Sequence, residues 1–99
     1  MSAEAGTAAF DPALPWQRAR SVAVRPEPFG ALVYSFSTRK LSFLKSPQLA
    51  TVVQTLADHP SALAAIDASG VPEAQRPNYV RALAELAGSR MIEPREATA

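Results

Sequence analysis

Three segments in the first half of the chain alternate between apolar and polar residues, the period of half-buried β-strands. They span 21–25, 30–36 and 38–44. The apolar residues that share a face within each segment are Val22 and Val24, then Leu32, Tyr34 and Phe36, then Leu41 and Phe43. The second and third segments are close enough in sequence to form a hairpin. Its turn lacks Asn-Gly or Asp-Gly, so its loop geometry stays open.

At Ser46 the apolar period lengthens to that of an α-helix. Ser46 is a good N-cap, and Pro47 suits the first helical position. That helix should end before Pro60, because the residue preceding a proline avoids the helical conformation. A second short helix should start at Pro60 and end at Gly70, which suits a left-handed C-terminal position. A third should span 77–88, and Met91-Ile92 could return as an extended segment.

Strands followed by helices predict an α+β fold, a three-stranded antiparallel sheet with helices on one face. Such a sheet has two edges. Much of the apolar fraction is alanine, so the predicted core depends on larger side chains: Phe29, Leu32, Val33, Tyr34, Phe36, Leu41, Phe43, Leu44, Leu49, Val52, Val53, Leu56, Leu63, Ile66, Tyr79, Val80, Leu83, Leu86, Met91 and Ile92.

The chain divides into one domain and two tails. Residues 1–15 are rich in small and polar residues without an apolar period, so we predict a disordered N-terminal tail. The domain should span 16–94, and 95–99 should be a frayed C-terminus. Between the first two strands, the segment 25–30 contains Pro26 and Pro28, which should end the first strand, and Gly30, which permits unusual backbone geometry.

Composition excludes several function classes. The formal net charge of +1 is too small to indicate a nucleic-acid or membrane partner. The absence of cysteine excludes disulfides, thiolate metal sites and a Cys nucleophile. His59 is the one histidine, and no nucleotide-binding or nucleophile motif is present, so we expect no enzyme activity and no cofactor. With no signal peptide or membrane-spanning stretch, we expect a cytoplasmic protein.

Two segments carry a specific resemblance to a known family. They are RPEPFGALVY at 25–34 and TRKLSFLKSP at 38–47. With Asp58-His59-Pro60, Gly70-Val71-Pro72 and Arg76-Pro77, they resemble the mycofactocin-biosynthesis peptide chaperones, the MftB family. That family is similar to the peptide chaperones of pyrroloquinoline quinone biosynthesis, PqqD. The resemblance covers about 16–94 and departs at Ser37-Thr38, where a nearby glycine is expected.

The resemblance implies a winged helix-turn-helix-like domain, called a RiPP recognition element, that binds the leader of a ribosomally made precursor peptide. The leader would add to the third strand, beside the third helix, and a radical S-adenosylmethionine (SAM) maturase would modify the precursor. The implied site residues are Arg39, Lys40, Leu41, Ser42, Phe43 and Leu44 in the strand, and Arg76, Tyr79, Val80, Leu83 and Leu86 in the helix.

Other readings of these residues stay open. The apolar side chains of the third helix could all be core, and the strand lysines and arginine could serve only to prevent edge-to-edge aggregation. A winged-helix DNA-binding regulator is the alternative function, although the second helix has Asp67 as its one charged residue. A scaffold subunit that docks an enzyme without touching the peptide is a third. The chain could be a monomer or a homodimer.

Overall fold

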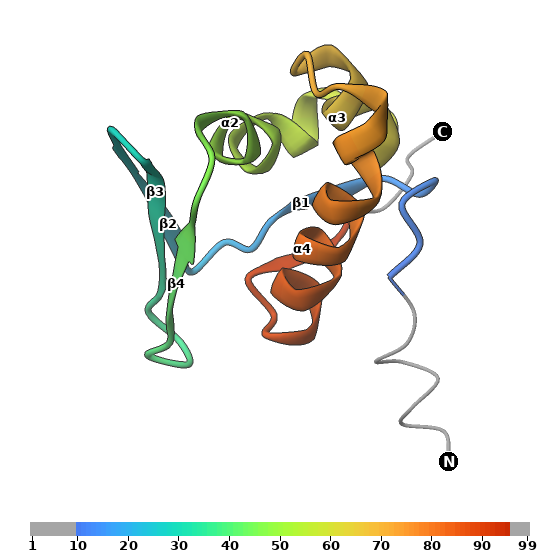
Figure 1. Cartoon of the computed structure of the whole chain (residues 1–99). Helices are drawn as coiled ribbons and strands as arrows, with labels where there is room; N and C mark the ends of the chain where they lie inside the picture. The colour runs from blue at the N-terminus through green and yellow to red at the C-terminus, as the bar shows by residue number, and fades with distance from the viewer. Residues whose placement is uncertain (1–9, 96–99) are drawn as a thin grey trace.

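A three-stranded antiparallel sheet forms one side of the domain, and in the part of the chain that is described all helices pack on one of its faces (Figure 1). The structure is a computed structural model that describes residues 10–95. The strands lie in the order β2-β3-β4, with bounds Val22–Glu27, Gly30–Ser35 and Leu41–Leu44. The helices are α2 (Pro47–Thr55), α3 (Ala62–Ala68) and α4 (Arg76–Gly88). The predicted α+β class, with a winged helix-turn-helix-like order of elements, is confirmed.

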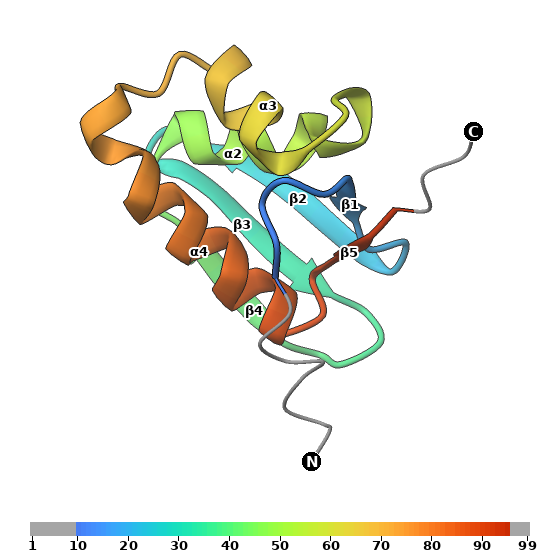
Figure 2. The same cartoon turned by 90° about the vertical axis from the view of Figure 1, so that its right-hand side faces the viewer.

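Two short strands outside the main sheet bring the ends of the domain together (Figure 2). Strand β1 (Trp16–Arg18) pairs antiparallel with β5 (Ile92–Pro94). The predicted return of the chain at Ile92 is therefore confirmed. The strand β1 was not predicted, because three residues are too few to show an alternating pattern. Two 3₁₀ helices, Leu56–Asp58 and Glu73–Gln75, follow α2 and precede α4.

The helices begin and end through local chemistry. Ser46 is the N-cap of α2, and its hydroxyl accepts a hydrogen bond from the Leu49 N–H at 3.2 Å, as predicted. Helix α3 starts slightly later than predicted, because Ser61 rather than Pro60 is positioned to cap it. Gly70 adopts φ +77° after α3, which confirms its predicted left-handed role.

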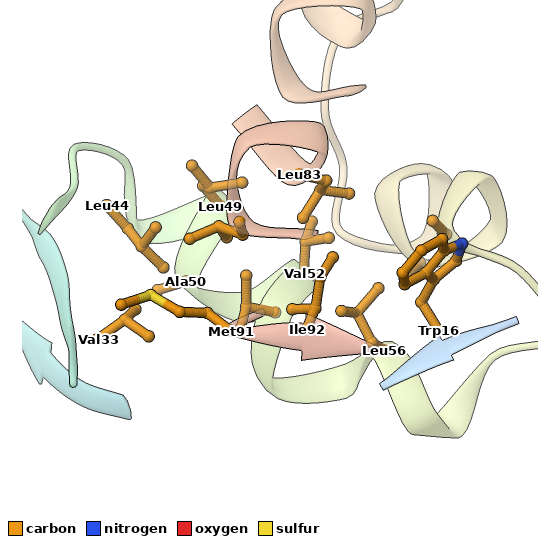
Figure 3. Close-up of a cluster of buried hydrophobic side chains, with 14 of the residues drawn as sticks. Trp16, Val33, Leu44, Leu49, Ala50, Val52, Leu56, Leu83, Met91 and Ile92 are labelled. Atoms are coloured by element: carbon orange, nitrogen blue, oxygen red, sulfur yellow. The ribbon is translucent and has the colours of Figure 1, made fainter. Parts of the chain in front are cut away.

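The end of α4 differs from the prediction. Gly88 is the last helical residue, but the left-handed position that closes the helix belongs to Arg90, with φ +61°. The Met91 N–H donates to the Leu86 carbonyl at 2.8 Å, and the Arg90 N–H donates to the Ala87 carbonyl at 3.0 Å. This pair of bonds is a Schellman motif. It directs Met91 into the core, where it lies near Val33 (Figure 3).

The strands alternate as predicted, but several residues assigned to the core are exposed. Phe29, Phe36, Leu41, Phe43 and Leu63 all lie on the surface. On β3 the buried side chains are small: Ala31, Val33 and Ser35. Small side chains there allow α2 to approach the sheet, and its Ala50 packs near Val33 (Figure 3). Periodicity alone does not say which face of the sheet the helices cover. The larger side chains of the strands were assigned to the covered face, and the structure places them on the other one.

The segment 25–30 has the structural role expected for it, with one correction. Strand β2 continues through Pro26 to Glu27, because Pro26 stands opposite Ala31 and its nitrogen faces away from β3. Gly30 has φ +152°, and a Cβ atom there would overlap the Leu44 carbonyl. Only glycine therefore fits where β3 begins against the end of β4.

The two predicted tails lie partly outside the described residues, which exclude 1–9 and 96–99. Residues 10–15, placed in the N-terminal tail by the sequence prediction, contact the domain. The Pro12 and Leu14 carbonyls accept hydrogen bonds from the first N–H groups of α3. The Trp16 indole donates to the Asp11 carbonyl at 2.9 Å. These long-range hydrogen bonds satisfy N–H groups in the first turn of α3. The apolar periodicity of the sequence does not predict such bonds. Arg95 similarly donates to the His59 carbonyl.

Candidate functional site

Strand β4 is an edge of the sheet, and its outer side has open main-chain groups. The Ser35 N–H donates to the Lys40 carbonyl at 2.9 Å, in the same register that places Val33 opposite Ser42. Bonded and non-bonded pairs alternate along an antiparallel ladder. Ser42 and Leu44 therefore turn their main-chain groups toward β3. Leu41 and Phe43 turn theirs outward, which leaves two N–H and two C=O groups along the open edge.

The opposite edge, formed by β2, is partly closed. The Phe36 N–H donates to the Ser21 carbonyl at 2.8 Å, so Val22, Val24 and Pro26 face outward there. The Val22 N–H already donates to the Ala19 carbonyl, and the Val22 carbonyl accepts from the Arg18 guanidinium. Pro26 has no N–H to offer. Val24 still turns one N–H and one C=O outward, so β4, with two outward N–H groups, offers more donors to an extended peptide than β2 does.

A pocket of about 190 Å³ opens beside this edge, where α4 runs alongside β4 (Figure 2). We call it the β4–α4 groove. Its lining residues are Ser42, Phe43, Leu44, Leu49, Ala82, Glu85, Leu86 and Ser89. Ala82, Glu85 and Leu86 of α4 and Ser89, its C-cap, are spaced i, i+3, i+4 and i+7, so they share one helix face. Leu44, Leu49 and Leu86 are buried and give the groove an apolar base, whereas Glu85 is exposed.

The structure divides the predicted strand residues into three groups. Arg39 and Lys40 are exposed in the β3–β4 turn, where Arg39 takes the left-handed position with φ +65° that a glycine would favour. Leu41 and Phe43 offer the outward main-chain groups. Ser42 and Leu44 lie on the inner face of the sheet, and both line the groove. The strand half of the predicted site is therefore brought together at one edge.

The predicted helix residues are more dispersed. Leu86 lines the groove, but Leu83 is fully buried in the core and Val80 packs against the core from a half-buried position. Tyr79 is also buried, and its hydroxyl lies 2.6 Å from the Ser46 hydroxyl, which connects α4 to the start of α2. Arg76 forms an ion pair with Asp67 at 2.6 Å and so binds α4 to α3.

Sequence reasoning missed four groove residues: Leu49, Ala82, Glu85 and Ser89. A helical-spacing search starting from Leu86 would have found the last three, because they lie on its face of α4. Leu49 could not have been found this way. It comes from α2, and only the packing of α2 between the sheet and α4 places it at the base of the groove.

The described residues offer little material for other chemistry. Between 10 and 95, no three His, Asp or Glu side chains lie close enough together to hold a metal ion. His59 is half-buried at the end of the first 3₁₀ helix, where its carbonyl accepts from Arg95. Within the same range, no helix combines the length and the apolar composition that crossing a bilayer requires.

Comparison with known proteins identifies the family of the chain. Residues 15–93 match the model of the Peptide chaperone MftB family. The chain belongs to this family. A relative named Peptide chaperone MftB from Mycobacterium ulcerans is 54% identical over 95 residues, which cover 96% of this chain and 87% of the relative. The Peptide chaperone MftB of Mycobacterium tuberculosis is 51% identical, with 95% and 86% covered.

A third relative of the same name, from Mycolicibacterium smegmatis, is 53% identical over 86% of this chain and 83% of its own length. No solved structure matches the chain. The resemblance inferred from the segments at 25–34 and 38–47 is thus confirmed by matches over nearly the whole chain.

Proposed function

We propose that this chaperone captures the leader of a ribosomally made precursor peptide, the mycofactocin precursor, as an added strand on the open edge of β4. The leader would lie beside α4 and be delivered to a radical SAM maturase. The observation that carries the proposal is the row of outward N–H and C=O groups at Leu41 and Phe43, directly beside an apolar-based pocket. An extended peptide satisfies such groups by β-augmentation.

Main-chain pairing sets the register of the leader but does not supply the affinity. Each hydrogen bond contributes about 0.5–1.5 kcal/mol net. The four outward groups at Leu41 and Phe43 thus contribute about 2–6 kcal/mol. Ordering a flexible backbone costs about 1–2 kcal/mol per residue, so a leader of several residues needs further stabilisation. Apolar side chains buried in the groove are the source that the structure offers.

The alternation of strands decides which leader side chain enters the groove. Residues opposite each other on paired strands share a face of the sheet. A leader residue opposite Ser42 or Leu44 therefore points to the inner face, into the β4–α4 groove. A cavity of about 150 Å³ accommodates benzene, so about 190 Å³ has room for one aromatic or branched aliphatic side chain. Leader residues opposite Leu41 and Phe43 point to the other face.

Charge near the edge favours an acidic leader. Arg39, Lys40 and Lys45 are exposed at the two ends of β4 and place positive charge along the path of the added strand. Such charges mainly accelerate encounter and orient the partner. Exposed ion pairs contribute only about 0–1 kcal/mol each, so they assist capture without replacing the apolar anchor.

In this proposal the chain itself is not an enzyme, because the groove contains one carboxylate, Glu85, and two serines, with no partner group arranged for catalysis. The names of the relatives support a chaperone role. The DNA-binding alternative is less favoured, because the exposed face of α3 presents Leu63 and an Asp67 already held by Arg76. That surface offers no positive charge to phosphates.

An NMR titration of the isotope-labelled chain with a synthetic leader peptide tests the proposal. We expect amide shifts to cluster over 38–44 and on α4, whereas shifts confined to α3 would contradict the binding site. Replacing Ala82 with leucine fills the groove. Since a buried leucine-sized side chain contributes about 1.5–3 kcal/mol, we expect leader affinity to fall about tenfold to a hundredfold. Ala68→Leu, the same change at an exposed position of α3, is the matched control.

A further inference from the structure

The sheet face turned away from the helices is unusually apolar. Side chains of paired residues share this face in two rows: Arg25, Leu32 and Phe43, then Ala23, Tyr34 and Leu41. Phe29 and Phe36 extend it at either end. Four of these residues are markedly exposed: Phe29 by 48%, Phe36 by 64%, Leu41 by 53% and Phe43 by 60%. We call this surface the outer face. No described segment covers it (Figure 1).

The aromatic side chains of the outer face are packed against one another. The Phe29 and Phe43 rings lie 6.4 Å apart, and the Tyr34 and Phe36 rings meet edge-on at 5.0 Å. Both separations suit aromatic pairs. Rings already held in place lose little conformational freedom when a partner covers them. Scattered single apolar residues are ordinary on a surface, whereas two aromatic pairs on one sheet face, together with Leu32 and Leu41, indicate an interaction site.

The segment that forms the sheet carries an excess of positive charge. Residues 21–45 include four basic residues, Arg25, Arg39, Lys40 and Lys45, and one acidic residue, Glu27, for a net charge of +3. The whole chain carries +1, so all other residues together carry −2. The one carboxylate of the segment is already paired, because Glu27 lies 3.2 Å from the Arg25 guanidinium. The surface that complements this one is apolar at its centre and acidic at its rim.

We propose that the outer face is a docking surface for the maturase, whose complementary surface is apolar with an acidic rim. This inference rests on the proposed function, since it takes the partner to be the enzyme that modifies the captured peptide. The two surfaces meet at Phe43, but the rest of the β4–α4 groove lies on the inner side of the sheet, away from the outer face. One chain can therefore hold a peptide and an enzyme at once, as delivery requires.

The position of the outer face also explains how the peptide is presented. A leader added to β4 extends the sheet by one strand, and its residues opposite Leu41 and Phe43 lie on the outer face. An enzyme docked there covers the chaperone and these leader residues together. Peptide and chaperone then form one composite surface, so the enzyme binds the loaded chaperone more tightly than the empty one.

Two other occupants, a second copy of the chain and an anionic membrane, suit the outer face less well. A second copy of the chain packed face to face would bring together two copies of segment 21–45, each with a net charge of +3 and with its one carboxylate already paired. An anionic membrane would suit the charge. However, a flat sheet with half-exposed rings offers no projecting side chains to insert between lipids, unlike the amphipathic helices that bind at membrane surfaces. Apolar centres with a charged rim are typical of protein interfaces.

The double substitution Tyr34→Ser with Phe36→Ser tests the docking surface. Both residues lie on the outer face at β3 and its end, one strand away from the leader's edge. We expect affinity for the purified radical SAM maturase, measured by interferometry, to fall about tenfold or more, as for interface anchors in general. Affinity for the synthetic leader should change less than about twofold. Leu63→Ser, which removes an exposed apolar side chain from α3, should change neither.

A second variant, Arg25→Glu, reverses the charge at an exposed position of the outer face and also frees Glu27 from its ion pair. It does not depend on tolerance of the serine pair. It should weaken maturase binding and flatten its dependence on salt. The docking surface is wrong if both variants bind the maturase like the native chain. It is also wrong if sedimentation shows a native dimer that the serine pair dissociates, or if the serine pair abolishes binding to phosphatidylglycerol vesicles.

The leader titration separates this inference from the proposed function. A native chain that fails to bind leader contradicts the proposed function, whatever the outer face does. A native chain that binds leader but not maturase contradicts the docking surface alone.

Discussion

Replacing Phe43 with proline tests the open edge at the level of a single N–H group. The Phe43 N–H points away from β3, so proline removes a donor that the native ladder does not use. Pro26 already occupies the equivalent outward position on β2, which shows that this sheet accepts proline there. The residue before the substitution, Ser42, is in an extended strand, the conformation that a following proline prefers.

The magnitude follows from the lost contact. One hydrogen bond contributes about 0.5–1.5 kcal/mol net, and the ring also obstructs the close approach of an added strand. We expect a total loss of about 1–1.5 kcal/mol, which corresponds to a five- to tenfold weaker leader affinity. The loss of the phenyl ring must be separated from this value. Phe43→Ala is therefore the reference, since it removes the same ring but keeps the N–H.

Leader affinity of both variants is measured by fluorescence anisotropy, and thermal unfolding of both is followed by circular dichroism. The alanine variant should bind the leader five- to tenfold more tightly than the proline variant, with both domains folded. Equal leader affinities in the two folded variants would refute the reasoning, because a leader added as a strand must accept a hydrogen bond from the outward N–H of residue 43. If those equal affinities are also lower than that of the native chain, the loss belongs to the phenyl ring.

Two further predictions concern the charged turn and the end of α4. Reversing Arg39 and Lys40 to glutamate should weaken leader binding about three- to tenfold at low salt and flatten its salt dependence, measured by titration at several ionic strengths. Arg20→Glu, at another exposed position, is the control. Leader affinity and salt dependence that stay unchanged in the double variant would contradict the role of these charges. Arg90→Gly should raise the free energy of unfolding by about 0.5–1 kcal/mol and the Tm by about 3–6 °C, because glycine adopts φ +61° without strain. Ser89→Gly, at φ −91°, should lower the Tm, and a stabilisation there equal to that at position 90 would contradict the argument.

The elements that the sequence predicts well are those decided by neighbouring residues. Ser46 and Pro47 specify the start of α2 through one capping hydrogen bond and one restricted dihedral angle. Gly70 ends α3 for an equally local reason. Strand β1 escaped prediction because its pairing with β5 joins residues at opposite ends of the domain. The same is true of residues 10–15, whose carbonyls are ordered by the first turn of α3.

The candidate site shows the same division. The sequence predicted a strand over 38–44 ahead of the helices, in a sheet with two edges. The family resemblance pointed to that strand, and to Leu86 among the helix residues, as parts of the peptide site. Tertiary packing decided that Leu83 is core, that Tyr79 bonds Ser46, and that Leu49 of α2 forms the base of the groove. These assignments depend on how α2 and α4 are placed against the sheet. The residue pattern of one helix does not determine that placement.

By itself the sequence determined the order of strands and helices, the α+β class, the caps and the alternation of each strand, because these depend on residues a few positions apart. Only the tertiary structure decided which face of that alternation is covered. Burying Ala31, Val33 and Ser35 beneath α2 leaves the larger Leu32, Tyr34 and Phe36 turned away from the helices, half-buried or exposed. The physical reason is that alternation has two equivalent faces, and the choice between them is made by the elements that pack on the sheet.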